Sequence, residues 1–79
     1  MNQVYMLICA RPKKLQSLMQ KLLRIKEISN MHSLYGQYDL ILEIKAKDMN
    51  AIDDVIDKKI RKVEGIERTE TLIVSDIPL

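Results

Sequence analysis

The chain has no phenylalanine and no tryptophan, and it contains one cysteine, one histidine, two glycines and two prolines. With Cys9 alone, neither an intrachain disulfide nor a metal site built from several cysteines can form. A lone thiol also suits a reducing compartment. No apolar run approaches the roughly 20 residues that cross a bilayer, and no signal-peptide pattern opens the chain. We therefore expect a cytoplasmic protein without a membrane partner.

Residues for catalysis are equally scarce. His32 is the only histidine, and no nucleophile, phosphate-binding loop or metal-ligand spacing accompanies it. Cys9 lies inside an apolar stretch, where a free cysteine usually packs as a small hydrophobic side chain. We expect neither an enzyme nor a bound metal or cofactor.

The formal net charge is only +2, which is too small to indicate a nucleic-acid partner. Residues 10–26 nevertheless contain no acid and several basic side chains. This segment either attracts an acidic partner or forms a solvated helix face. An RNA-binding sheet would expose aromatic side chains for base stacking, and Tyr5 is the sole aromatic in the first and last predicted strands. Direct nucleic-acid binding is therefore not expected.

What the sequence does contain is a series of apolar patterns. Residues 4–9 form a continuous apolar run, which predicts a strand buried on both faces. Pro12 fits the first turn of a helix. The apolar stripe of that helix consists of Leu15, Leu18, Met19, Leu22 and Leu23. Residues 28–35 and 38–46 predict two further strands, joined by a tight hairpin at Gly36.

The second half of the chain predicts one helix and one strand. Asp48 is a good N-cap, and Gly65 suits the helix C-terminus, where a left-handed residue is needed. The apolar stripe consists of Ile52, Val55, Ile56, Ile60 and Val63. Asp54–Lys58 and Asp57–Arg61 add i,i+4 ion pairs. Residues 66–75 are rich in Thr, Leu, Ile and Val and predict the last strand.

The order β-α-β-β-α-β is the ferredoxin-like α+β arrangement, here a single domain over residues 1–79. Right-handed crossovers place both helices on one face of a four-stranded antiparallel sheet, with the first and third strands central. The first strand offers apolar side chains to both faces, so one row remains without helices to cover it. Pairing of two sheets in a homodimer would bury that row.

The most informative segment is Tyr35-Gly36-Gln37-Tyr38-Asp39. Its simplest interpretation is a hairpin in which Asp39 satisfies local amides. Alternatively, Asp39 lies at the start of a central strand, where a carboxylate is costly unless a cation or several N–H groups meet it. The ammonium group of an amino acid is one such cation, and backbone N–H groups near Gly36 could hold its carboxylate.

Two segments together carry a family resemblance. Gly36-Gln37-Tyr38-Asp39-Leu40 resembles the Gly-x-Tyr-Asp segment of the Lrp/AsnC effector domain, and residues 65–74 resemble that family's closing Gly-Val-x-x-Thr-x-Thr-x-Ile-Val strand. The resemblance implies a homodimer of apposed sheets, an octamer of four dimers, and an amino-acid effector bound between subunits. The effector-binding positions carried over are Gly36, Tyr38, Asp39, Thr69 and Thr71.

Two features depart from the family pattern. Family regulators carry an N-terminal helix-turn-helix domain, whereas here the first strand begins almost at Met1. The chain thus resembles the stand-alone form, which would influence transcription by associating with a full-length Lrp/AsnC-type regulator. In addition, Tyr35 stands where the family commonly has a small polar residue, so it could narrow the pocket.

Two other functions remain open on the sequence alone. The domain could be a structural oligomerisation module with a vestigial pocket. It could also be a small enzyme on the dimeric α+β barrel plan, although only His32 is available for such chemistry. The ACT domain, another ferredoxin-like domain that senses amino acids, fits less well. It typically has glycine in the first β–α connection, where this chain has Ala10-Arg11-Pro12.

Overall fold

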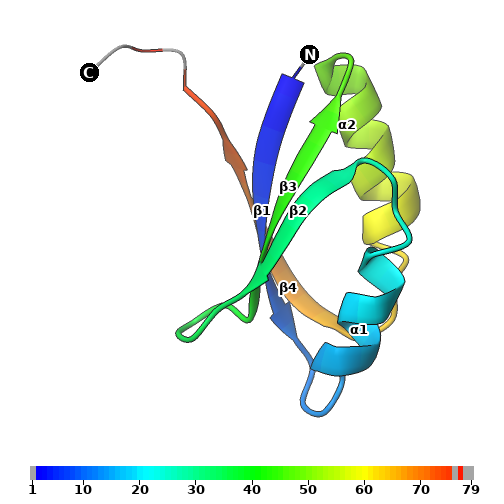
Figure 1. Ribbon diagram of the computed structural model, residues 1–79, viewed down its shortest axis with the longest axis vertical. Coiled ribbons are helices and arrows are strands. Elements are labelled where there is room, and N and C mark those ends of the chain that lie inside the picture. Colours follow the sequence, from blue (N-terminus) through cyan, green and yellow to red (C-terminus); the bar gives the residue numbers. More distant parts are fainter. Residues whose placement is uncertain (1, 76, 78–79) are drawn as a thin grey trace.

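The structure, a computed structural model, describes residues 2–75 and residue 77. Its elements follow in the order β1 (Asn2–Ala10), α1 (Leu15–Leu22), β2 (Ile28–Ser33), β3 (Leu40–Ala46), α2 (Met49–Val55), the π-helical turn η1 (Ile56–Ile60) and β4 (Ile66–Ile73). Figure 1 shows this arrangement, with η1 continuing α2. The predicted β-α-β-β-α-β order is confirmed.

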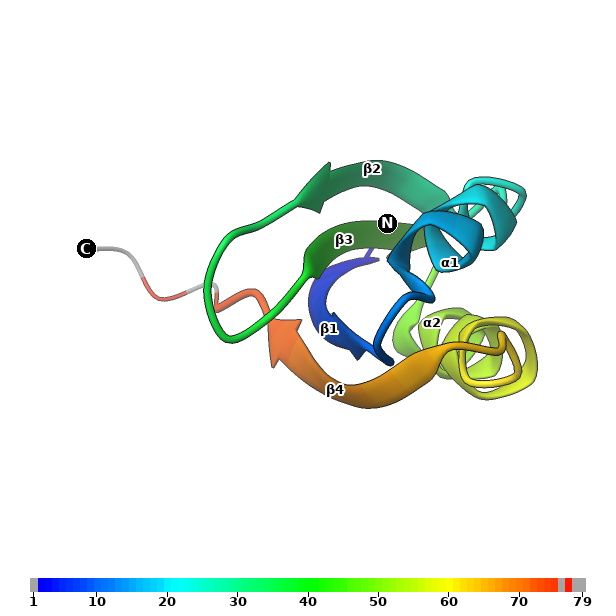
Figure 2. The same cartoon turned by 90° about the horizontal axis from the view of Figure 1, so that it is seen from below.

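The four strands form one antiparallel sheet in the order β2-β3-β1-β4. Strands β1 and β3 are central, as predicted, and Figure 2 shows both helices on the same side of the sheet. The register pairs Met6 with Leu42 on β3 and with Thr71 on β4. Directly paired residues in antiparallel strands point to the same face, so this register decides which face each side chain joins.

The hydrophobic core lies between the sheet and the helices. It consists of Val4, Met6, Ile8, Leu18, Leu22, Leu40, Leu42, Ile44, Ile52, Val55, Ile56 and Ile60. Burying each such side chain contributes about 1.5–3 kcal/mol relative to leaving it exposed. The alternate residues of β1 and β3 form the opposite face of the sheet, called the open face below because no helix covers it.

The first helix begins later than its sequence predicts. Pro12 lies in a turn before α1 and not in the first helical turn, because Lys13 has a φ of 66°, which is incompatible with a right-handed helix. Leu23 was also wrongly assigned to the buried stripe: it follows the last helical residue and is 68% exposed.

The second helix begins as its sequence predicts, but it is α-helical only to Val55 and continues as the π-helical η1 to Ile60. The Asp48 carboxylate accepts a hydrogen bond from the Ala51 N–H at 2.8 Å and so caps α2. The prediction of Gly65 at the helix C-terminus is wrong, because η1 ends at Ile60 with Arg61 as its C-cap. Gly65 lies four residues further on, in the connection to β4, with a φ of 107°. A Cβ at Gly65 would lie 3.1 Å from the Cβ of Lys14, so the missing side chain lets the two connections approach closely.

The open face is only partly exposed to solvent. Tyr5, Leu7 and Ile41 are half-buried, and Cys9 is only 6% exposed. The Cys9 Sγ lies 2.7 Å from the carbonyl oxygen of Gln37, which shows that the β2–β3 connection covers it. Within residues 2–75 and 77, no helix is long and apolar enough to cross a membrane.

Candidate functional site

The β2–β3 connection spans residues 34–39 and is wider than the tight hairpin predicted at Gly36. Gly36 has a φ of 131° and is exposed, with open space where a Cβ would stand. The connection closes through a hydrogen bond from the Leu34 N–H to the Asp39 carbonyl at 2.8 Å. Tyr35 is fully exposed, so within one chain it does not fill a pocket.

Asp39 fastens this connection to the central strand β1. Its backbone N–H donates to the Ile8 carbonyl at 2.8 Å, and its Oδ2 accepts a hydrogen bond from the Ala10 N–H at 2.7 Å. The Ala10 N–H needs a partner because the β1–β3 pairing ends at Ile8 and Leu40, so no β3 carbonyl lies opposite Ala10. The carboxylate thus satisfies a backbone donor in one chain, which agrees with the simpler interpretation of the motif.

Tyr38 points from the same connection to the last strand. Its hydroxyl donates to Glu70 Oε1 at 2.7 Å, and the guanidinium of Arg68 lies 5.4 Å from the ring centroid. The hydrogen bond to the Glu70 carboxylate raises the pKa of Tyr38 above its usual value. Sequence reasoning missed Arg68 and Glu70 as partners of Tyr38. Only the strand register, which pairs Arg68 with Cys9 and Glu70 with Leu7, places them on the open face.

Thr69 and Thr71 lie on the other face of β4. Thr69 pairs with Ile8 and Thr71 with Met6, and both of these β1 residues point toward the helices. Thr69 is half-buried and Thr71 is exposed. In one chain, therefore, the structure brings Gly36, Tyr38 and Asp39 together but does not bring the two threonines to them.

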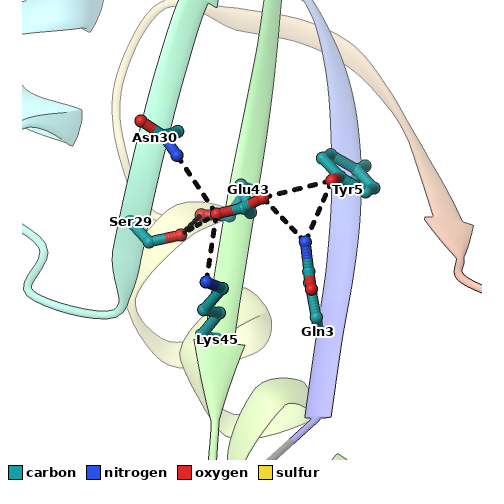
Figure 3. Close-up of polar contacts among 6 residues, drawn as sticks. All are labelled: Gln3, Tyr5, Ser29, Asn30, Glu43 and Lys45. Atoms are coloured by element: carbon teal, nitrogen blue, oxygen red, sulfur yellow. Dashed lines mark hydrogen bonds and ion pairs between the residues drawn. The ribbon is translucent and has the colours of Figure 1, made fainter.

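A polar network that the sequence did not reveal surrounds Glu43 on the open face (Figure 3). The Glu43 carboxylate accepts hydrogen bonds from Ser29 at 2.6 Å, Asn30 at 3.2 Å, Gln3 at 2.7 Å and Tyr5 at 3.1 Å. The Lys45 ammonium lies 3.6 Å from Glu43 Oε1, and the Glu43 side chain is only 13% exposed. These residues come from three neighbouring strands, so the network ties β2, β3 and β1 together.

The hydrogen bond from Ser29, assisted by those from Asn30 and Tyr5, lowers the pKa of Glu43 to about 2. The hydrogen bond to Glu43 in turn raises the pKa of Tyr5. Glu43 is therefore a fixed negative charge on the open face, next to the half-buried Tyr5 and close to Ile41. A depression of about 160 Å³ beside it is lined by Tyr5, Asn30, His32, Ile41, Leu42 and Glu43.

The only histidine of the chain, His32, lines this depression. His32 is exposed and pairs with Ile41 across β2 and β3. Among the described residues, no group of three or more His, Cys, Asp or Glu side chains is arranged to hold a metal ion. The sheet therefore presents a carboxylate whose oxygens are occupied by donors and a shallow apolar surface around it.

Comparisons with known proteins agree with this geometry. The crystal structure of TTHA0845 from Thermus thermophilus superposes with a TM-score of 0.90 at 32% identity, covering 100% of this chain and 99% of that one. The HTH-type transcriptional regulator PH0140 of Pyrococcus horikoshii is 25% identical over 73 residues, which are 92% of this chain and 46% of that protein. The chain thus spans about half the length of the curated relatives it matches.

A more distant structure shares only the fold. The transcriptional regulator NMB0573 of Neisseria meningitidis, solved as a complex with L-Met, has a TM-score of 0.82 at 17% identity, covering 99% of this chain and 53% of that one. The relatives named as HTH-type are described as transcriptional regulators. The model of the Lrp/AsnC ligand binding domain matches residues 3–79, and the chain therefore belongs to the Lrp/AsnC family as its ligand-binding domain.

Proposed function

We propose that the chain is an oligomeric module that binds an amino-acid effector at the connection formed by Gly36, Tyr38 and Asp39. One observation carries this proposal: Asp39 and Tyr38 fix that connection against β1 and β4 within a domain whose family is defined by ligand binding. The hydrogen bonds of Asp39 to Ala10 and of Tyr38 to Glu70 leave the loop backbone around Gly36 accessible. Exposed N–H groups of such a loop are suited to a carboxylate.

The effector site is proposed to lie between copies of the chain. The open face presents Tyr5, Leu7 and Ile41, which are half-buried, and Leu72, which is 39% exposed. A small domain buries little of its own apolar surface, so pairing this face with a second copy adds a shared core. A homodimer, and an octamer of four dimers, would bring β4 of one copy toward the 34–39 connection of another.

In this proposal the chain acts in the cytoplasm and alters transcription by joining a DNA-binding relative. Titration calorimetry of the 79-residue chain with each of the twenty amino acids tests effector binding. We expect one amino acid, or one chemical class, to bind and to raise the melting temperature. No stabilisation by any amino acid at millimolar concentration would contradict the proposal.

The structural alternative is favoured by one observation, namely that Asp39 already accepts the Ala10 N–H. In that case the loop serves only to close the domain, and the chain acts as an oligomerisation module with a vestigial pocket. Co-purification with a full-length regulator in amounts unaffected by every amino acid would support this alternative over effector binding.

A further inference from the structure

A second hollow lies on the helix side of the sheet, away from the 34–39 connection. It has a volume of about 510 Å³ and forms where the β1–α1 turn meets the end of η1 and the start of β4. Its lining consists of Arg11, Lys14, Arg61, Lys62, Val63, Glu64, Gly65 and Ile66. The volume is within the range of sites that hold small molecules.

Four of the lining side chains are cationic and one is acidic. Arg11 and Lys14 belong to the acid-free segment that the sequence singled out, whereas Arg61 and Lys62 come from a region 50 residues further along, and the fold alone brings them together. Lysines and arginines this close repel one another unless an anion lies among them. The hollow therefore concentrates positive potential at one point of a nearly neutral molecule.

The ion pairs around the hollow are weak. The ammonium of Lys14 lies 3.7 Å from Glu64, and the guanidinium of Arg61 lies 3.7 Å from Asp57; all four side chains are at least half exposed. Exposed pairs of this kind contribute about 0–1 kcal/mol, so an incoming anion can replace them. Lys62 has no acidic partner among the residues that the structure describes.

The backbone beneath these side chains is held in place. The Arg11 N–H donates to the Gly65 carbonyl at 2.7 Å, and the Arg11 Nε donates to the Ile66 carbonyl at 3.4 Å. Gly65 has no side chain, which allows the Lys14 turn to approach. The cationic side chains thus extend from a fixed frame, which lowers the entropic cost of binding.

The composition of the hollow points to a compact anion with an apolar part. Val63 and Ile66 are half-buried and offer an apolar surface next to the cations. Acidic side chains interrupt the positive surface: Glu64 lines the hollow and pairs with Lys14, and Asp57 pairs with Arg61. A nucleic-acid backbone needs an extended basic track. Phosphate groups suit arginine and lysine donors, and a nucleoside suits the apolar surface.

We propose that this cationic hollow binds a nucleoside di- or triphosphate, with its phosphates among Arg11, Lys14, Arg61 and Lys62. The hollow shares no lining residue with the proposed effector loop, although Asp39 of that loop bonds to Ala10, next to Arg11. The two sites can be tested with separate variants. Binding weakens as the salt concentration rises, because the contacts are partly exposed ion pairs.

Titration calorimetry of the full chain with ATP, GTP, ADP and inorganic tripolyphosphate at low salt tests this site. The double variant Arg61→Gln/Lys62→Gln should bind nucleotide about threefold to fivefold more weakly per cation removed, since partly exposed ion pairs are lost. The matched control is Lys21→Gln/Arg24→Gln, which removes the same charge from exposed positions of the acid-free segment outside the hollow. It should stay within about twofold of the parent chain, since screening weakens distant charges.

Amide NMR spectra locate the ligand without any substitution. ATP should shift the amide signals of Arg11 and Gly65 and leave that of Gly36 in place. No binding of any nucleotide, equal weakening in both double variants, or shifts at Gly36 alone would overturn the proposal. Tripolyphosphate binding as tightly as ATP would contradict the nucleoside assignment, and displacement of ATP by short duplex DNA would indicate a nucleic-acid surface instead.

Discussion

The hydrogen bond between Asp39 and the Ala10 N–H permits a quantitative test of the central motif. In Asp39→Ala the donor loses an acceptor at 2.7 Å while β1 and its register shift remain. Charge-assisted hydrogen bonds contribute about 1.5–3 kcal/mol, and because Asp39 is half-buried we expect the lower half of that range, about 1.5–2 kcal/mol. For a domain of this size, each kcal/mol shifts the melting temperature by about 4–8 °C, so the expected loss is about 6–16 °C.

The matched variant is Asp39→Asn, whose amide oxygen can still accept from Ala10. We expect it to lose less than about 1 kcal/mol, because it replaces a charged acceptor by a neutral one. Thermal and urea unfolding followed by circular dichroism, at one protein concentration for all variants, measures both losses. An alanine variant that melts within about 2 °C of the parent chain would refute the structural role of this hydrogen bond.

The same two variants distinguish a structural role of Asp39 from direct contact with an effector. If Asp39 also faces the ammonium of an effector, Asp39→Asn should remain folded and lose amino-acid binding, since an amide gives up the charge. If Asp39 serves only the loop, the asparagine variant should bind as the parent does. Calorimetry with the amino acid identified for the parent chain decides between these outcomes.

Three further predictions concern other parts of the domain. Gly65→Ala should destabilise the fold by about 1–3 kcal/mol, because its φ is 107° and a Cβ meets the β1–α1 turn at 3.1 Å. Gly36→Ala, also at positive φ but in open space, is its control in urea unfolding, and an equal loss would contradict the steric argument. The pKa of Glu43 is about 2 when folded, below its ordinary 4.5, so its stabilising effect is complete above pH 4.5 and is lost as the pH falls toward 2. Urea midpoints between pH 6 and pH 2 should therefore fall less steeply in Glu43→Gln, and parallel curves would contradict this. Leu7→Asp should dissociate the proposed dimer in light scattering, whereas Gln16→Asp, at an exposed position of α1, should not. A Leu7→Asp chain that stays dimeric would place the interface elsewhere.

Regular periodicity made most of the fold predictable. Alternation in residues 40–44 and the helical spacing of Ile52, Val55, Ile56 and Ile60 report which side faces a common core, and that core is what the structure contains. Local sequence patterns fail to predict the backbone where a contact with a residue distant in sequence determines it. Lys13 adopts a left-handed φ, so Pro12 cannot join the helix, and the next residue, Lys14, approaches Gly65. Nothing near Pro12 in sequence encodes this approach.

The same limit applies to the Glu43 network. Its donors come from Gln3, Tyr5, Ser29 and Asn30, which lie up to 40 positions from Glu43. In the sequence, a glutamate between apolar residues of a strand indicates only that one face is polar there. Which donors surround the carboxylate depends on the β2–β3 irregularity that sets both Ser29 and Asn30 beside it.

The placement of the threonines restricts how an effector site can be assembled. Tyr38 reaches Glu70 on the open face, while Thr69 and Thr71 point to the helix face of the same strand. The backbone of β4 lies between these two sets of side chains, so one small amino acid cannot touch both sets within a single chain. An effector that contacts both sets therefore needs the threonines of one copy and the 34–39 connection of another. An effector at a site built in this way binds the oligomer and not the monomer. It would therefore stabilise the assembly by RT ln(1 + [L]/Kd), which rises with the logarithm of the effector concentration above Kd.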